Sequence, residues 1–335
     1  MESSAVSYSG LDIPMAESGK EGRVIRQHLA HYIVSTGEEE VTCAMSSKLR
    51  KQLKYPEADS GSRRQRVQSV RRVRVVDPVA IGDRVRFDPG GGGTGMILEV
   101  LPRKNKIARR SSGTSGKEQV LGANIDQALP VFSAAEPPPD WELLDRMLAI
   151  ATWQEIPAVI CVNKMDLSTG NALAERLNVY RQIGYRVICT SIVTDQGKDE
   201  FCELIKNRTS LFMGPSGVGK SSLLNWQQPG LNIRTGEISS STGEGRHTTS
   251  HTELVRLSGG GFVGDLPGVR EFYLWDIEPE DVPGLYVEFL ELEGECQFRN
   301  CSHVHEPECI VREAVEMGIV DPLRYQSYLQ LRQSP

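Results

Sequence analysis

A glycine-rich segment, Gly214–Ser221, constrains this chain more than any other feature of its sequence. It reads GPSGVGKS, fits the pattern G-x-x-x-x-G-K-[ST], and stands between a strand-like run, SLFM, and a helix-like run, SSLLNW. Glycines let backbone N–H groups converge on phosphate oxygens, and the N-terminus of the following helix adds partial positive charge. The segment therefore predicts a phosphate-binding loop at the carboxyl end of a parallel strand.

Two residues at the end of this loop have distinct expected roles. Lys220 neutralises the β- and γ-phosphate oxygens, and Ser221 reaches the Mg²⁺ ion that accompanies a nucleotide. The alternative is a glycine-rich turn that carries a lysine by chance, which the flanking strand and helix disfavour. The residues predicted to bind the phosphates are Gly214, Pro215, Ser216, Gly217, Val218, Gly219, Lys220, Ser221 and Ser222.

A second motif, NKMD, follows the apolar run AVICV and predicts recognition of guanine. The Asp166 carboxylate can accept two hydrogen bonds from the guanine edge, Asn163 can brace neighbouring loops, and the alkyl stem of Lys164 can lie along the base. Met165 completes the motif, and Ser191, within a Thr-Ser-Ile run after the strand-like RVICT, can supply a backbone N–H to the base. Taken alone, NKMD also fits a capped helix start at Asp166.

The order of the two motifs is reversed. In ordinary GTPases the phosphate loop comes first and N-K-x-D follows, whereas here residues 163–166 and 190–192 precede residues 214–221. The sequence therefore predicts a circularly permuted arrangement. Alternation of strand-like and helix-like runs after residue 124 predicts a parallel sheet with helices on both faces and ligand loops at the carboxyl ends of its strands.

Two further segments resemble GTPase switches. Asp265-Leu-Pro-Gly268 resembles D-x-x-G, in which Asp265 holds Mg²⁺ through water and the Gly268 N–H binds the γ-phosphate; a plain turn is the alternative. Residues 243–250 resemble the first switch, and we favour Thr249 over Thr248 as the threonine that meets Mg²⁺. His247 can position or activate water, or merely stabilise its loop.

The residue after Gly268 is Val269, where many GTPases place a glutamine that orients the attacking water. Intrinsic hydrolysis is therefore expected to be slow, or to use another residue.

The region before the alternating pattern predicts a different fold. Short alternating runs from about residue 22 to residue 108 are punctuated by Gly, Pro and Asp, as in a small antiparallel barrel. The arginine-rich insert at 60–72 lacks apolar periodicity and is expected to be an exposed loop, with solvated decoration and nucleic-acid contact about equally favoured. Residues 1–21 are polar and are expected to form a flexible tail without a secretory signal.

Near the end of the chain, cysteines and histidines cluster. Cys296, Cys301, His303 and Cys309 offer three thiolates and one imidazole, a complete tetrahedral shell for structural zinc. Their spacing is not the common C-x₂-C pair, and His305 is a competing ligand. No metal, a different shell, or disulfides are the weaker alternatives.

Composition limits the remaining classes. Hydrophobic residues make up 39% of the chain and charged residues 24%, and no run of eighteen apolar residues occurs, so neither a disordered nor a membrane-spanning protein is indicated. The net charge of −6 argues against a chain that coats nucleic acid over its whole surface.

Together, these residues resemble the RsgA (YjeQ) family of permuted GTPases, which assist maturation of the bacterial small ribosomal subunit. The resemblance covers roughly residues 22–330 and rests on NKMDL, GPSGVGKSSL, GRHTTSHTEL, DLPGVREF and CQFRNCSHVHEPEC in the family's order. It implies a multidomain chain with an OB-fold barrel that contacts ribosomal RNA at 22–115, a permuted G domain at 120–275 and a C-terminal zinc domain at 276–335.

The resemblance further implies GTP hydrolysis, with Mg²⁺ as cofactor, that is stimulated by the 30S subunit and its 16S rRNA. A cytoplasmic monomer without a membrane partner is expected. Two other hypotheses stay open: an RNA-binding module in which the nucleotide is a structural or regulatory ligand, and a permuted GTPase that acts on another particle.

Overall fold

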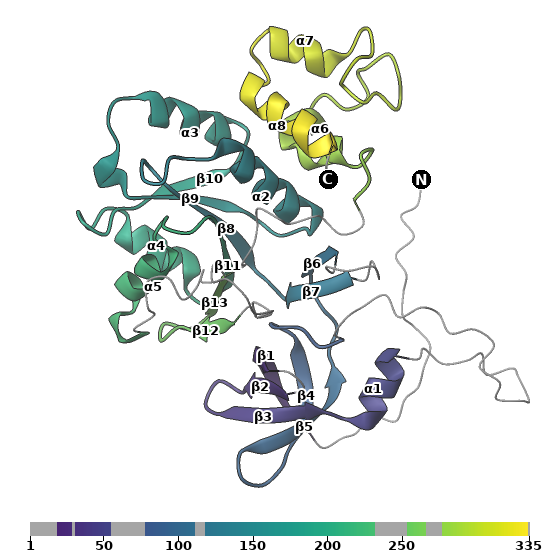
Figure 1. Cartoon of the computed structure of the whole chain (residues 1–335), viewed down its shortest axis with the longest axis vertical. Coiled ribbons are helices and arrows are strands. Elements are labelled where there is room, and N and C mark those ends of the chain that lie inside the picture. Colours follow the sequence, from purple (N-terminus) through teal and green to yellow (C-terminus); the bar gives the residue numbers. More distant parts are fainter. Residues whose placement is uncertain are drawn as a thin grey trace, which may run out of the picture.

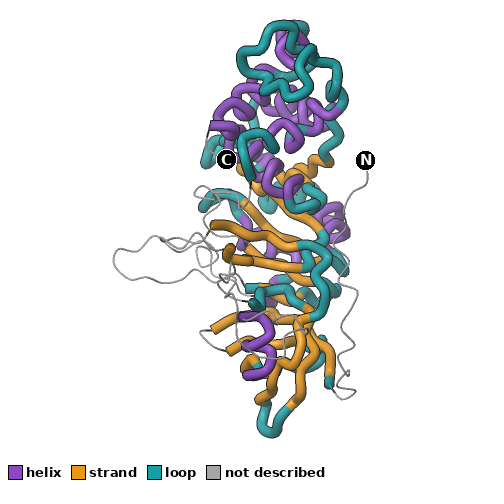
Figure 2. The backbone as a smooth tube through the Cα atoms, turned by 90° about the vertical axis from the view of Figure 1, so that its right-hand side faces the viewer, coloured by secondary structure: helices purple, strands orange, loops and turns teal. Residues whose placement is uncertain are grey.

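The computed structural model describes residues 19–28, 31–54, 78–110, 118–231, 253–265 and 277–333. Figure 1 shows three parts in a row: a small barrel at one end, a larger sheet with helices in the middle, and a group of short helices at the other end. The view turned by 90° shows the same elongated order (Figure 2). In the described ranges, no helix is both long enough and apolar enough to cross a membrane.

The N-terminal part is a closed five-stranded barrel. Its strands are β1 (Lys20–His28), β2 (His31–Ser35), β3 (Glu40–Met45), β4 (Arg84–Pro89) and β5 (Thr94–Val100), in the order β1-β2-β3-β5-β4, and β1 pairs with β4 to close it. Helix α1 (Ser47–Lys54) lies between β3 and β4 along the chain. Alternate side chains such as Val34, Cys43 and Phe87 are fully buried inside. The barrel confirms the predicted OB-type fold class.

The barrel differs from the sequence expectation in two respects. Strands β3 and β5 pair in parallel, so the barrel is not antiparallel throughout. The run KIARR, expected as a barrel strand, forms β6 (Lys106–Arg110) and pairs outside the barrel with β7 (Glu118–Ala123). A strand with this alternating pattern can pair either inside the barrel or outside it. The residues of KIARR therefore do not reveal which strand is their partner.

The middle part is a six-stranded sheet. Its order is β10-β9-β8-β11-β13-β12, formed by β8 (Gln127–Ser133), β9 (Val159–Asn163), β10 (Arg186–Cys189), β11 (Thr209–Met213), β12 (Leu254–Arg256) and β13 (Phe262–Asp265). Only β12 runs antiparallel to its neighbour, β13. Every residue of β8, β9 and β11 is buried, which explains their continuous apolar runs.

Helices cover both faces of this sheet. Buried side chains of α2 (Trp141–Trp153) and α3 (Ala172–Gln182) form one apolar core with the sheet, and those of α4 (Lys198–Ile205) and α5 (Lys220–Gln227) form another on the opposite side. Two short 3₁₀ turns, η1 (Met165–Leu167) and η2 (Pro229–Leu231), follow β9 and α5. The doubly covered parallel sheet is confirmed.

The C-terminal part contains η4 (Val282–Leu285), α6 (Val287–Leu290), α7 (Ile310–Glu316) and α8 (Pro322–Gln333). Helix α8 packs on α2 of the sheet domain, and Tyr328 meets the stacked rings of Tyr286 and Phe289 edge to face beside the Cys/His loop. The apolar residues of this part belong to the same core as α2, so the small helical part is anchored on the sheet domain.

Candidate functional site

The phosphate loop joins β11 to α5. Gly214 has a φ of 146°, and a Cβ there would lie 2.3 Å from the Val131 carbonyl oxygen; Gly219 has a φ of 98°, and its Cβ would lie 2.4 Å from Asn163 Nδ2. Both positions therefore require glycine. Because the backbone turns so tightly, α5 begins directly after the loop, with its free N–H groups at the carboxyl edge of the sheet.

Lys220 lies inside this loop. Its side chain is 5% exposed, and its Nζ donates to the carbonyl oxygens of Gly214 at 2.8 Å and Pro215 at 3.1 Å. Nζ also lies 3.8 Å from Oδ2 of Asp265, which ends the neighbouring strand β13. Burial lowers the pKa of Lys220, and the Asp265 carboxylate acts in the opposite direction. The loop, a cation and a carboxylate are thus brought together at one point.

The NKMD segment lies at the end of β9, beside the phosphate loop. Asn163 is 2% exposed; its Nδ2 donates to the Val218 carbonyl at 2.9 Å, and its Oδ1 accepts from Thr190 Oγ1 at 3.1 Å. Asn163 therefore ties the base-reading strand both to the phosphate loop and to the strand end at Thr190. A helix-capping motif alone would not account for these links across 55 and 27 residues.

Asp166 is exposed, and one of its oxygens is held in place. Ser191 Oγ donates to Asp166 Oδ1 at 2.5 Å, and the Met165 N–H donates to the Thr190 carbonyl. Lys164 adopts a left-handed φ of 60°, and its Nζ donates to the Glu136 carbonyl at 2.5 Å. The acidic side chain is thereby presented to solvent with a fixed orientation, as bidentate recognition of a base edge requires.

Sequence reasoning missed several groups that support this site. The carbonyls of Glu136 and Val218 and the hydroxyl of Thr190 all bind residues of the NKMD motif. Trp226 on α5 donates its Nε1–H to Asp195 Oδ1 at 2.8 Å, which links the phosphate-loop helix to the loop after β10. A sequence pattern carries no signal for a backbone carbonyl, whereas Thr190 belongs to the predicted Thr-Ser-Ile run, and only the role of its hydroxyl was not predicted.

Some predicted residues lie outside the described ranges. These are His247, Thr248, Thr249, Gly268 and Val269, together with the insert at 60–72 and most of the tail. Asp265 is the described part of the switch-like segments, and it lies next to the phosphate loop.

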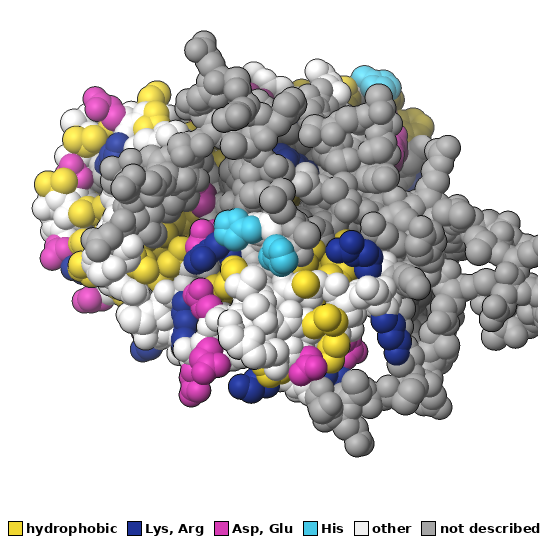
Figure 3. All heavy atoms as spheres, turned by 60° about the horizontal axis from the view of Figure 1, so that its bottom comes forward, with side chains coloured by type: hydrophobic (Ala, Val, Ile, Leu, Met, Phe, Trp, Pro, Cys, Tyr) yellow, Lys and Arg dark blue, Asp and Glu magenta, His cyan; other side chains and the backbone are white. Residues whose placement is uncertain are grey.

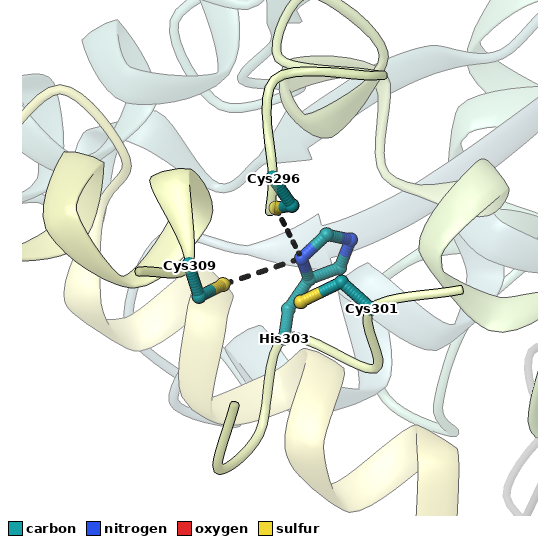
Figure 4. Close-up of side chains that lie close together, drawn as sticks. All are labelled: Cys296, Cys301, His303 and Cys309. Carbon is teal, nitrogen blue, oxygen red and sulfur yellow. Dashed lines mark hydrogen bonds between the residues drawn. The ribbon is translucent and has the colours of Figure 1, made fainter. Parts of the chain in front are cut away.

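The Cys/His cluster forms the second candidate site. Ligand atoms of Cys296, Cys301, His303 and Cys309 all lie within 4.8 Å of one another, and His303 Nδ1 lies 3.6 Å from Cys296 Sγ and 3.4 Å from Cys309 Sγ (Figure 4). In the described ranges these four residues form the group that can hold a metal ion. The exposed His305 is not part of it.

The surroundings of this cluster fix its loop. Glu306 accepts N–H bonds from Ser302, Val304 and His305, and Tyr325 Oη donates to the His303 carbonyl at 2.7 Å. Burial lowers the pKa of His303, which favours the neutral imidazole that metals bind. Three soft sulfur donors and one imidazole around a common centre fit a tetrahedral metal ion.

A phosphate loop on a doubly covered parallel sheet, with a base-reading motif from an earlier strand, defines a nucleotide-binding protein of the P-loop class. Comparison with known proteins gives the family: residues 100–275 match the model described as RsgA GTPase. A relative from Moorella thermoacetica, named small ribosomal subunit biogenesis GTPase RsgA, is 47% identical over 248 residues, covering 74% of this chain and 82% of the relative. The chain belongs to the RsgA GTPase family.

Solved structures agree with this assignment. YjeQ from Thermotoga maritima is 31% identical, with a TM-score of 0.72, and the match covers 94% of this chain and 98% of YjeQ. YloQ, described as a circularly permuted GTPase, is 27% identical with a TM-score of 0.65, covering 96% and 97%. The predicted GTPase class, the family and the permuted multidomain fold are therefore confirmed.

Proposed function

We propose that this GTPase binds the small ribosomal subunit and assists its late maturation, hydrolysing GTP to GDP and phosphate. The relative from Moorella thermoacetica carries small-subunit biogenesis in its name, and the family is shared. The observation that carries the nucleotide part is the junction of Lys220, Asp265 and Asn163 around one loop: Lys220 Nζ lies 3.8 Å from Asp265, and Asn163 binds the Val218 carbonyl.

In this proposal, separate groups of residues bind the base and the phosphates of the nucleotide. Asp166, held by Ser191, accepts the N–H groups of guanine, and the stem of Lys164 lies along the base. The loop 214–222 binds the phosphates, and Lys220 turns from its present carbonyl partners to the β- and γ-phosphate oxygens. Adenine lacks the donor edge that Asp166 reads, so GTP is preferred.

The hydrolytic end of the site combines described and undescribed residues. Ser221, Asp265 and Thr249 are proposed to hold Mg²⁺, which supplies charge neutralisation between the β- and γ-phosphates when bound. Gly268 N–H is proposed to bind the γ-phosphate, and His247 to position the attacking water. Oxygen donors of a hydroxyl and a carboxylate suit Mg²⁺, and Ser221 and Asp265 both border the loop.

We propose zinc as the metal of the Cys/His cluster. Three thiolates and one neutral imidazole leave no open position, which is typical of a structural rather than a catalytic zinc site. Because the cluster lies above Phe289 and Tyr328, its role is to hold the small helical part together.

We propose 16S rRNA as the partner of the barrel, and a monomer in the cytoplasm as the working form. On the face that Figure 3 turns forward, Lys and Arg side chains lie among acidic ones and form no continuous basic field in the described part. On this face, RNA contact therefore has to be local, with separate basic groups on phosphates.

The proposal is tested by co-sedimentation of the protein with purified small and large ribosomal subunits. We expect binding to the small subunit with a non-hydrolysable GTP analogue and weaker binding with GDP. Equal binding to both subunits, or binding that ignores the nucleotide, would point to another particle. Thr249→Ala separates the enzyme from a plain RNA-binding module: an enzyme loses turnover but keeps nucleotide, whereas a module keeps its biological activity.

A further inference from the structure

The barrel contacts the sheet domain through a hairpin that borders the nucleotide site. Strands β12 and β13 form the antiparallel edge of the sheet, and Figure 1 shows them facing β1 and β2 of the barrel. Ile25 of β1, Ile81 and Leu254 of β12 are buried together, with Phe262 of β13 packed against them. The hairpin is therefore held from one side by the barrel.

Two arginines of β1 add directed contacts to this apolar patch. Arg26 Nε lies 2.6 Å from Glu253 Oε1, with side chains 34% and 45% exposed. Arg23 Nη1 donates to Thr209 Oγ1 at 2.7 Å, and its guanidinium lies 5.1 Å from the centre of the Phe262 ring. Exposed ion pairs contribute little to stability. The exposed Arg26–Glu253 contact therefore matters for where the hairpin lies rather than for whether the chain folds, whereas Arg23 is more buried and ties β1 to Thr209 of β11 as well as to Phe262.

The other side of the same hairpin leads to the phosphate loop. Leu254, the first residue of β12, pairs with Gly264 of β13. Glu253, which directly precedes β12, is therefore at the end of the hairpin where β13 ends with Asp265. Asp265 in turn pairs with Phe212 of β11 and lies 3.8 Å from Lys220 Nζ. In the sequence, β12 directly follows the segment that contains Thr249, and β13 directly precedes the one that contains Gly268. The hairpin therefore connects the barrel contact at Glu253 to Asp265, which borders the loop.

We propose that Arg23 and Arg26 of the barrel are positioning residues for GTP hydrolysis, acting through the β12–β13 hairpin on Asp265. This inference rests on the proposed role of Asp265 in holding Mg²⁺. It also gives the barrel a regulatory use, because a partner that binds the barrel and shifts β1 changes hydrolysis, and by linkage the nucleotide changes the affinity of that partner.

The test measures GTP hydrolysis by the full-length protein as a function of GTP and of Mg²⁺. For Arg26→Ala we expect kcat to fall about three- to tenfold while KM for GTP stays within about twofold, because the lost contact acts on the transition-state geometry. The Mg²⁺ concentration for half-maximal rate is expected to rise. A merely structural role would lower the melting temperature without moving the Mg²⁺ requirement. Arg23→Met is expected to act in the same direction.

Charge exchange keeps the test independent of folding. Arg26→Glu and Glu253→Arg should each lower kcat, and the double variant should recover most of it. The matched control is Arg86→Ala, which removes ion pairs with Glu99 at 2.6 Å and Glu21 at 3.7 Å that lie wholly within the barrel and should leave kcat within about twofold.

The outcomes are distinct. This inference is overturned if the wild-type protein hydrolyses GTP and the variants Arg23→Met, Arg26→Ala, Arg26→Glu and Glu253→Arg keep its kcat and its Mg²⁺ dependence. The proposed function would then still stand. Absence of hydrolysis by the wild-type protein, alone and with small subunits, overturns both. Loss of kcat in Arg26→Ala with recovery in the exchanged pair supports the inference.

Discussion

Arg324 of α8 donates to Asp145 of α2 at 2.7 Å, and both side chains are shut off from solvent, with 1% and 0% of their surface exposed. The same guanidinium binds both oxygens of Glu288, and Tyr180 Oη donates to Asp145. Charged groups that are buried away from water require oppositely charged or hydrogen-bonding partners to offset the loss of hydration. This pair therefore anchors the helical part on the sheet domain.

Removing one partner of this pair should be costly. We expect Arg324→Ala to lower the free energy of unfolding by about 3–5 kcal/mol, because it leaves the buried carboxylates of Asp145 and Glu288 without their cation. Denaturant unfolding measures the change. Arg186→Ala, which breaks an exposed ion pair with Glu200, is the control and should cost at most about 1 kcal/mol. Equal losses for Arg324→Ala and the control would contradict the account.

The base specificity depends on Asp166. In Asp166→Asn we expect GTP affinity to fall roughly 10- to 100-fold, since a charged acceptor of two hydrogen bonds is lost. Xanthosine triphosphate should gain, because its additional carbonyl accepts from the new amide. Titration with fluorescent nucleotides measures both changes, with Asp199→Asn on α4 as a control. Unaltered preference for GTP in Asp166→Asn would place the base elsewhere.

The contact between Gly219 and Asn163 predicts a steric effect. A Cβ at Gly219 would meet Asn163 Nδ2 at 2.4 Å in a conformation that side chains disfavour, so Gly219→Ala should weaken nucleotide binding and lower stability by about 1–3 kcal/mol. Gly230→Ala, in open space beyond the C-terminal end of the same helix, is the control. Nucleotide binding and thermal unfolding identical to wild type would show that the loop has room to relax.

Metal removal should act on the helical part. The wild-type protein is expected to bind about one zinc ion per chain, and Cys309→Ser should lose it together with helical signal from residues 277–333. Elemental analysis and circular dichroism measure these quantities. Cys202→Ser on α4, outside the cluster, should keep the metal. Zinc content that is unchanged in Cys309→Ser would exclude this ligand set.

Local sequence patterns predicted those parts of the fold whose conformation depends on residues close together in the sequence. The loop between β11 and α5, the buried strands and most helices follow from glycine positions and apolar periodicity. The pairing of KIARR with β7 and the Arg324–Asp145 pair, 179 residues apart, did not follow, because both depend on contacts that only the folded chain makes. The supporting carbonyls of Glu136 and Val218 were missed for the same reason.

The proposed function requires GTP hydrolysis to respond to one particle, the small ribosomal subunit. The most direct measurement is the steady-state rate of phosphate release from GTP by purified protein, alone, with salt-washed small subunits, and with large subunits, and with ATP in place of GTP. We expect slow release by the protein alone and a large increase that requires both GTP and the small subunit. The same slow rate under every condition would contradict the proposed function.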